Sequence, residues 1–405
     1  MMIQFIPFIL QFFLILFYIP CSLTGEMQGS TSLKLIVTAD TQYHFMCENM
    51  NFQCKAISRN CRDENDFPMN LELDRKVNVT IQAALEKCIA LESRYANRVQ
   101  RRSILDLIEQ HNKTVKGLII NGDLTNFGHT HQLEEFKKGW IDYFPVPVYV
   151  GLGNHDYQNN VNDCVLNYCA HTMLSWFTTF TRKHSIYPDI HRKTNGFSED
   201  YKGSLAYTER ICDGTGKVCV FMIQLNNAID YTVKIDAFIA RYELTSPLEY
   251  LKKELDLIVD SGIPILINVH QCEGLSRRKL RSFLESFIGN NQAKNPKIAV
   301  LFGHMHRYHE IYYYCMHDQR VPFIYAGSVP NNRFSILEFL ENKGYITGYS
   351  ALDPLVYKDQ TLKEHKRLEL FGDCLQSPHV EFSKTFLHIL QEMLANNRTV
   401  PLDYQ

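Results

Sequence analysis

The sequence predicts an α/β fold, and three kinds of observation lead to this prediction. Short apolar runs typical of buried strands recur between residues 33 and 349. Stretches with apolar residues at helical spacing separate several of these runs, as in 77–110. Five of the apolar runs end on a residue that can bind a metal ion. Since the carboxyl ends of strands build the sites of open α/β sheets, these five residues are expected to lie close together.

The first part of the chain alternates between strands and helices. The predicted strands are 33–39, 117–121 and 146–150, and the predicted helices are 77–110, as one helix or two, and 132–143. The third strand runs into a turn flanked by Gly151 and Gly153, which allow a tight bend because they lack a Cβ atom. This turn ends on Asn154, a neutral oxygen ligand, on His155, a proton donor or acceptor near neutral pH, and on Asp156.

The second part of the chain contains a hairpin followed by further strands and helices. Cys212 and Cys219 flank the turn signal Asp-Gly-Thr-Gly, so we predict a disulfide between two strands there. Cys164 and Cys169 are candidates for a second local bridge. The predicted strands are 218–225, 264–269, 298–302, 311–314, 323–326, 334–339 and 345–349, and the predicted helices are 171–182, 246–259, 276–287 and 380–394.

Two stretches interrupt this regular pattern. Residues 43–76 are polar and rich in Asn and Cys, which indicates a loop pinned by disulfides. Residues 157–202 are aromatic and carry few periodic signals. Both are predicted to be inserts in one domain at 33–350, and such loops commonly set substrate choice. Residues 351–405 are predicted to form a C-terminal tail with a helix.

The N-terminus indicates the secretory pathway. Residues 1–19 are almost wholly apolar and small residues follow directly, so 1–25 is predicted to be a cleaved signal peptide. The alternative is an uncleaved segment that anchors the protein in a membrane, whereas no later stretch of the mature chain is apolar enough to span one. Three Asn-x-Thr triplets are predicted glycosylation sites, at Asn78, Asn112 and Asn397.

Cysteine content and charge narrow the function classes. Of the 12 cysteines, Cys21 leaves with the signal peptide and 11 remain, a content typical of an oxidising compartment. We therefore expect a secreted or lysosomal protein. The chain has 42 basic and 44 acidic residues and a net charge of -2. This balance argues against a nucleic-acid-binding patch, which requires a clearly basic surface.

The five residues at strand ends are types that bind metal ions in proteins. They are Asp40, Asp123, Asn154, His270 and His304. Any one of them is explained by a polar residue that ends a strand. Five in one chain make chance a poor explanation, and together they predict a metal site.

The motifs that hold these residues resemble those of the calcineurin-like metallophosphoesterases over about residues 33 to 345. The matching motifs, in order, are Asp40-Thr41-Gln42, Gly122-Asp123, Gly153-Asn154-His155-Asp156, His270 and Gly303-His304-Met305-His306. The resemblance implies a sandwich of two mixed β-sheets flanked by helices, with the site at one edge. It also implies that 33–350 is a catalytic domain that hydrolyses phosphate monoesters or diesters through a metal-bound hydroxide. The family includes purple acid phosphatases and acid sphingomyelinase.

The resemblance also implies two divalent metal ions, with Mn, Fe, Zn and Mg as candidates. The first ion would be held by Asp40, Gln42, Asp123 and His306, and the second by Asp123, Asn154, His270 and His304. A shared carboxylate suits such a pair, because two ions about 3.5–4 Å apart need an anionic bridge. His155 is the predicted catalytic residue that stabilises charge on the phosphate or protonates the leaving oxygen, and Asp156 is the predicted orienter of its imidazole.

Two residues depart from the family's usual pattern. Gln42 lies where a His is usual, and its harder oxygen ligand favours Mn, Mg or Fe over Zn at the first site. The alternative is that Gln42 only hydrogen-bonds a bound water. Asn126 lies where purple acid phosphatases have a Tyr, so a purple ferric enzyme is not expected. The rival function is an inactive secreted binding protein on the same scaffold, in which several ligands would normally be lost.

Overall fold

The computed structural model describes residues 32–43, 81–162, 164–341, 343–353, 357, 360–374 and 379–382. All of them belong to the unit that begins at Ser32. The predicted signal peptide, the glycosylation sites Asn78 and Asn397, and nearly all of the 43–76 insert lie outside the described residues. None of the helices in the described part of the chain is both long and apolar enough to cross a membrane.

The first large sheet has six strands in the order β16-β15-β14-β1-β2-β3. Their bounds are β1 Leu33–Thr38, β2 Val115–Asn121, β3 Val148–Gly151, β14 Arg333–Leu340, β15 Lys343–Ala351 and β16 Leu362–Glu369. Strands β1, β2 and β3 run parallel, and β14, β15 and β16 pair antiparallel, so the sheet is mixed. The parallel strands all end at one edge, where the first three motifs begin.

The second large sheet has seven strands in the order β17-β12-β13-β11-β10-β7-β6. Their bounds are β6 Tyr207–Cys212, β7 Cys219–Gln224, β10 Ile265–Asn268, β11 Ile298–Phe302, β12 Glu310–Met316, β13 Gln319–Tyr325 and β17 His379–Glu381. Strands β7, β10, β11 and β13 run parallel, while β6, β12 and β17 are antiparallel to their neighbours. The predicted α/β class with mixed sheets is confirmed.

Alternate residues of the second sheet pack on opposite sides, which explains why its strands are apolar throughout. Leu266 of β10 and Leu301 of β11 join one core cluster with Leu35 of β1, so they face the first sheet. Ile267 and Val300 join a second cluster with the helices α8, Leu248–Ile258, and α9, Gly274–Asn290. Strands covered on both faces need apolar side chains at every position.

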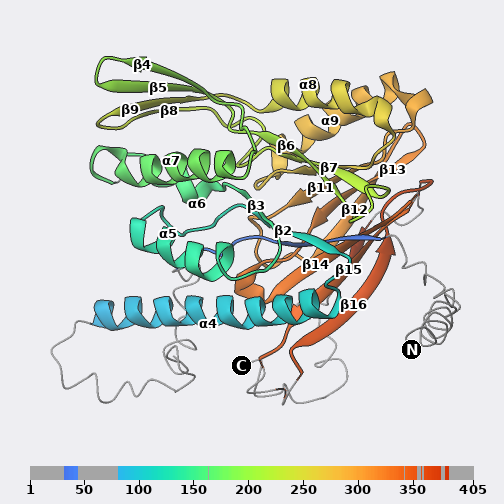
Figure 1. Cartoon of the computed structure of the whole chain (residues 1–405), viewed down its shortest axis with the longest axis horizontal. Coiled ribbons are helices and arrows are strands. Elements are labelled where there is room, and N and C mark those ends of the chain that lie inside the picture. The colour runs from blue at the N-terminus through green and yellow to red at the C-terminus, as the bar shows by residue number, and fades with distance from the viewer. Residues whose placement is uncertain are drawn as a thin grey trace, which may run out of the picture. The chain divides into compact units, whose positions relative to one another are not determined.

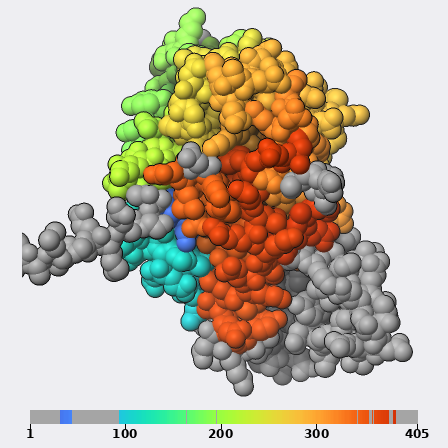
Figure 2. All heavy atoms as spheres, turned by 90° about the vertical axis from the view of Figure 1, so that its right-hand side faces the viewer, coloured from blue at the N-terminus to red at the C-terminus, as the bar shows by residue number. Residues whose placement is uncertain are grey.

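One long helix, α4 at Ile81–Gln110, runs along the first sheet (Figure 1). The sequence left open whether this region holds one helix or two, and the structure has one. Buried polar contacts fix its position: Gln100 Nε2 donates to the carbonyl oxygen of Arg333 at 2.8 Å, and Thr38 Oγ1 lies 3.3 Å from Gln100 Oε1. Figure 2 shows the C-terminal strands in red across one face, with the yellow and orange region of α8 and α9 above them.

The 157–202 region contains more structure than its sequence pattern predicts. It follows α6, Asn154–Tyr157, and contains α7, Tyr168–Lys183, and the strands β4 and β5, which join β8 and β9 from further along the chain in a four-stranded sheet of order β4-β5-β9-β8. Its strands are β4 His191–Asn195, β5 Ser198–Gly203, β8 Val233–Asp236 and β9 Ala240–Leu244. Sequences such as Ser-Glu-Asp-Tyr-Lys-Gly in β5 give only a weak period-two signal because few of their residues are buried.

The remaining helical elements are short. They are α5 Thr130–Phe136, which continues into a π-helical turn at Lys137–Ile141, and the 3-10 turns Val165–Asn167, Val259–Ser261, Gln292–Lys294 and Val329–Asn331. The predicted polar helix at 132–143 therefore starts earlier and ends in a wider turn.

Beyond residue 350 the described chain adds strands to both sheets. Strand β16 extends the first sheet, and β17 pairs with β12 through Val380 and Ile311. The helix predicted to start at Val380 is wrong at that position, because backbone pairing along the edge of β12 outweighs the local helical pattern. Residues 383–405 lie outside the described chain.

Three disulfides join described cysteines. The bridges expected for Cys212–Cys219 and Cys164–Cys169 are present, and Cys315–Cys374 ties the C-terminal segment to β12. Among the described cysteines, Cys272 is buried and unpaired. Burial raises the pKa of its thiol to about 12, so this cysteine is unreactive at neutral pH.

Candidate metal centre

The loops that follow β1, β2, β10 and β11 meet at one edge of the two large sheets. Two contacts join them there: the His304 backbone N–H donates to Asp40 Oδ1 at 3.0 Å, and His270 Nδ1 lies 2.8 Å from the carbonyl oxygen of Asn121. Asp40, Asp123 and His304 have φ values of 57°, 51° and 65°, in the left-handed region. Non-glycine residues seldom adopt this conformation, and it concentrates at functional sites.

Asp123 lies at the centre of the predicted ligands and is fully buried. Its Oδ2 lies 3.0 Å from His270 Nε2 and accepts a hydrogen bond from Gln42 Nε2 at 3.1 Å. Asp40 Oδ1 lies 3.5 Å from His306 Nε2. On the other side, His304 Nδ1 and Asn154 Oδ1 are 3.0 Å apart. The structure thus brings all seven predicted ligands together.

Two groups of side chains place their ligand atoms within 4.8 Å of one another, and they share one residue. They are Asp40, Asp123 and His306, and Asp123, His270 and His304. These groups divide the residues in the same way as the two ligand sets implied by the sequence resemblance. The other two predicted ligands contact members of these groups: Gln42 Nε2 donates to Asp123, and Asn154 Oδ1 lies beside His304 Nδ1.

The site has the features that a bound cation requires. Asp40 Oδ2 is buried and has no hydrogen-bond partner among the described residues, and His270 Nε2 is buried with the Asp123 carboxylate 3.0 Å away. Such unpartnered buried polar atoms are costly unless another group satisfies them. His270 Nδ1 is engaged by the Asn121 carbonyl, which leaves Nε2 as the ligand atom, the usual arrangement for a metal-binding histidine. Carboxylate, carboxamide and imidazole donors together suit divalent transition metals.

The buried charges also favour a cation. Burial raises the pKa of the Asp123 carboxyl, but the neighbouring His270 and His155 lower it by more. The net pKa therefore lies below the ordinary value. Burial alone lowers the pKa of His270, but Asp123 and Asp40 raise it to about 10. Both shifts show that this carboxylate-rich centre attracts positive charge, which a metal ion or a protonated imidazole supplies.

Glycine is required where the loops approach each other. At Gly153 a Cβ atom would overlap the carboxylate of Asp123 and would lie 2.5 Å from its backbone nitrogen. At Gly122, where φ is 85°, a Cβ atom would lie 2.6 Å from Cγ of the His270 ring. These two glycines therefore allow the strand ends to converge on Asp123.

His155 lies at the start of α6, directly beside this centre. Its backbone N–H donates to Asp123 Oδ1 at 2.9 Å, and its ring Nδ1 lies 2.9 Å from the carbonyl oxygen of Asn126. A carbonyl oxygen can only accept, so this contact fixes the proton on Nδ1 and leaves Nε2 available.

Asp156 has a different role from the one predicted. Its two oxygens accept hydrogen bonds from the backbone N–H groups of Gly153, Leu124 and Thr125 and from the Thr125 hydroxyl, at 2.9–3.1 Å. The prediction that Asp156 orients the imidazole of His155 is wrong in this structure, because the Asn126 carbonyl occupies Nδ1. Asp156 instead holds the second and third motifs together.

A comparison with protein-family models decides the family. The model of the calcineurin-like phosphoesterases matches residues 33–308, more than half of the chain. The chain belongs to this family. Its members are metal-dependent phosphoester hydrolases, and the predicted resemblance is confirmed.

Similar solved structures include a purple acid phosphatase from yellow lupin (Lupinus luteus) seeds, at 10% identity and a TM-score of 0.43 over 89% of this chain. They also include a 5'-nucleotidase from Candida albicans, at 10% identity and a TM-score of 0.42 over 92% of this chain. This phosphoesterase-family chain covers 55% of each of those chains. A search of curated proteins found no match.

The sequence analysis did not predict a role for two asparagines whose side chains hold the strands and loops of this site together. Asn121 Nδ2 donates to the carbonyl oxygen of Leu301 at 3.0 Å, which joins β2 of the first sheet to β11 of the second. Asn226 Oδ1 accepts from the Leu152 backbone N–H at 3.0 Å and holds the loop before Asn154. The available signal was their position, since each follows an apolar strand as the five predicted ligands do.

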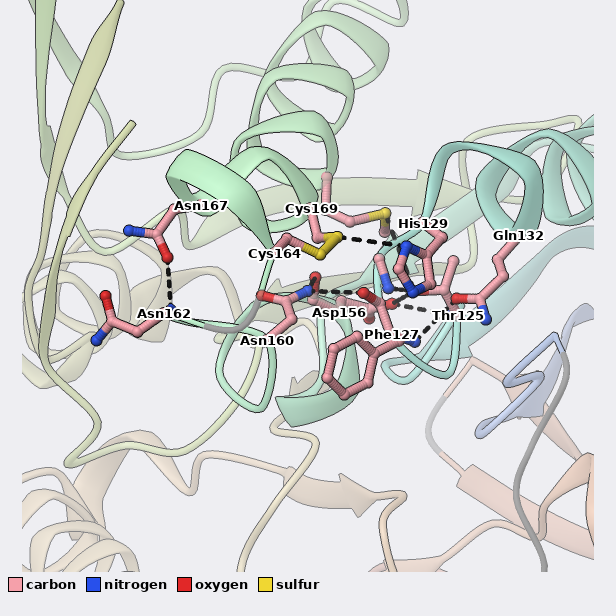
Figure 3. The surroundings of a disulfide bond; sticks show 12 residues. Thr125, Phe127, His129, Gln132, Asp156, Asn160, Asn162, Cys164, Asn167 and Cys169 are labelled. Carbon is pink, nitrogen blue, oxygen red and sulfur yellow. Dashed lines mark hydrogen bonds between the residues drawn. A yellow bond between two sulfur atoms is a disulfide. The ribbon is translucent and has the colours of Figure 1, made fainter. Parts of the chain in front are cut away.

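Among the described residues, His129 after the second motif lies outside these two ligand groups. His129 Nδ1 lies 3.4 Å from Cys169 Sγ of a disulfide (Figure 3). Its ring stacks on those of Phe127 and His131. Among the predicted glycosylation sites, Asn112 is exposed in the turn after α4.

Proposed function

We propose that this chain is a secreted phosphoesterase with a binuclear metal centre that hydrolyses phosphate monoesters or diesters. The observation that carries the proposal is the pair of ligand groups that share the buried Asp123. The unpartnered, buried Asp40 Oδ2 supports it, because a bound cation satisfies this atom.

The residues divide between two metal positions. Asp40, Gln42, Asp123 and His306 would hold the first ion, and Asp123, Asn154, His270 and His304 the second. When bound, two divalent ions act as Lewis acids on the phosphoryl oxygens and lower the pKa of a coordinated water. At the first position the amide oxygen of Gln42 favours Mn, Mg or Fe over Zn. If Gln42 acts only through a water molecule, this preference disappears.

His155 is the residue proposed to move a proton. Its Nδ1–H is donated to Asn126, and its backbone N–H to Asp123, so the side chain is held from two sides beside the metal positions. A protonated Nε2 stabilises negative charge on the phosphate or gives its proton to the leaving oxygen, and this kind of catalysis typically contributes about 10²–10⁴-fold.

The proposed location is the secretory pathway, in the extracellular space or a lysosome. Three disulfides between described cysteines support an oxidising compartment. The exposed Asn112 in an Asn-x-Thr triplet is accessible for glycosylation. Sequencing the mature N-terminus separates a cleaved signal peptide from a retained membrane anchor.

The test is hydrolysis of p-nitrophenyl phosphate and bis-p-nitrophenyl phosphate by the secreted protein, with Mn, Zn, Mg or Fe added in turn. We expect turnover of at least one ester and its loss by about a thousandfold or more in Asp123→Asn, since that change removes the shared ligand. Asp142→Asn is the matched control, because Asp142 is exposed. Absence of turnover with every metal would leave the inactive binding protein as the better account.

A further inference from the structure

An apolar groove opens next to the second motif. It encloses about 750 Å³ and is formed by the turn at 127–129, the disulfide loop and first turn of α7 at 164–171, and the β8–β9 turn at 237–239. None of the residues that line it is Asp, Glu, Lys or Arg. Its volume lies within the range of about 300–1,000 Å³ typical of small-molecule sites.

The wall at 164–171 is fixed in place. The Cys164–Cys169 disulfide closes the loop (Figure 3). Asn167 Nδ2 donates to the carbonyl oxygen of Asp236 in β8 at 2.9 Å. Leu166 and Asn167 both have a φ of 54°. Residues in this strained conformation persist only where the surroundings hold them, so the groove wall is preformed.

Large apolar side chains point to solvent around this groove. Val165 and Leu166 are 83% and 60% exposed on the disulfide loop, and Phe238 and Ile239 are 81% and 52% exposed on the β8–β9 turn. Turns normally carry Gly, Asn, Asp or Ser at their tips. A contiguous exposed apolar surface of this kind marks a binding site for an apolar group.

The groove and the metal centre share one stretch of chain. Phe127 lines the groove, and the preceding residue, Asn126, holds the His155 ring through its carbonyl. Asn160 Nδ2 donates to the carbonyl oxygens of both Phe127 and Asp156, at 3.0 and 2.9 Å. A group bound in the groove is therefore positioned by the same turn that positions His155.

We propose that this groove binds the apolar chain of the substrate, so that the preferred phosphate esters carry an aliphatic group of several carbon atoms. The inference rests on the proposed function and names its substrate class. The polar side chains of the lining are His129, Tyr168 and His171, and the rest of it is apolar or a disulfide, so most hydroxyls of a sugar would be desolvated there without a hydrogen-bond partner. An aliphatic chain gains from the same desolvation.

The experiment measures kcat/KM for a series of alkyl p-nitrophenyl phosphate diesters from methyl to octyl, each below its micelle concentration. Full burial of one methylene is worth about fourfold, so a half-open groove predicts about twofold per methylene and roughly a hundredfold from methyl to octyl. The double variant V165S/F238S is expected to flatten this rise, with the largest loss of kcat/KM for the octyl ester.

The matched control is Phe197→Ser. Phe197 is fully exposed on the β4–β5 turn and does not line the groove, so its replacement should leave the chain-length dependence unchanged. A flat series in a protein that hydrolyses the methyl ester overturns the groove proposal and leaves the proposed function standing. Hydrolysis of p-nitrophenyl phosphate without turnover of any of these diesters also overturns the groove proposal alone, and no turnover of either kind of ester overturns both. The rise with chain length could persist in V165S/F238S, or this variant could dissociate a dimer that the unmodified protein forms. Either result shows that the groove does not bind the substrate chain and overturns the groove proposal.

Discussion

The replacement Asp156→Asn tests whether this carboxylate supports the loops or takes part in catalysis. Its two oxygens accept four hydrogen bonds, three from backbone N–H groups and one from the Thr125 hydroxyl. An Asn side chain has only one acceptor oxygen. If that oxygen still accepts from the backbone N–H groups of Gly153 and Leu124, the new NH₂ group faces the backbone N–H and the hydroxyl of Thr125. The hydroxyl can rotate to accept from this NH₂ group, but the N–H cannot.

The loss of stability expected for Asp156→Asn follows from this geometry. One buried backbone N–H is left unsatisfied, which costs about 1–3 kcal/mol, and the remaining bonds lose the assistance of a charge. Relief of the repulsion between Asp156 and Asp123 offsets part of this loss. We expect a net destabilisation of about 2 kcal/mol, which lowers the Tm of a unit of this size by roughly 3 °C.

The assay combines thermal unfolding of the metal-loaded protein with steady-state kinetics. The lower Tm should come with a kcat at saturating metal that falls by no more than about a hundredfold, because residues that support metal ligands typically contribute 10–100-fold. Asp142→Asn, at an exposed site, controls for the loss of a charge. An unchanged Tm with kcat reduced as far as in a His155 variant would refute this reasoning and restore Asp156 as the partner of the imidazole.

Four further predictions follow from the site and the core. His155→Gln should lower kcat by about 10²–10⁴-fold with metal content unchanged, and an equal loss of metal would contradict a role in proton transfer. Gly153→Ala should reduce metal content measured by elemental analysis, because the added methyl group overlaps the Asp123 carboxylate; full retention of metal would show that the loop can move aside. Gln42→His should raise the ratio of Zn to Mn bound in competition, and an unchanged ratio would support the view that Gln42 acts through a water molecule. Leu255→Ala should lower the free energy of unfolding by about 2–5 kcal/mol, whereas the exposed Leu257→Ala on the same helix should change it by less than about 0.5 kcal/mol, as denaturant titration can check.

The fold class and family were predictable because the informative residues are local in sequence. Strands β10 and β11 are apolar at nearly every position, since both their faces are covered, and each leads directly to a histidine. The glycines beside Asp123 and Asn154 are equally visible, because close approach of the loops permits no side chain there.

What the sequence did not reveal depends on contacts between distant segments. Asp156 follows His155 directly, yet its partners are the backbone N–H groups of Leu124 and Thr125, more than 30 positions away, and of Gly153. Strand β17 forms only because the edge of β12 is available to pair with it. The apolar groove is assembled from three separate turns, and no one of them has a sequence pattern that distinguishes it from an ordinary loop.

The central claim is that Asp123 is the shared ligand of two metal ions, and elemental analysis of the purified secreted protein tests it most directly. The account predicts about two divalent ions per chain, a clear loss of metal in Asp123→Asn, and no loss in Asp142→Asn. Phosphoesterase activity should follow the metal content across the three proteins. A folded protein that retains its metal after Asp123→Asn, or that binds none before it, would contradict the account.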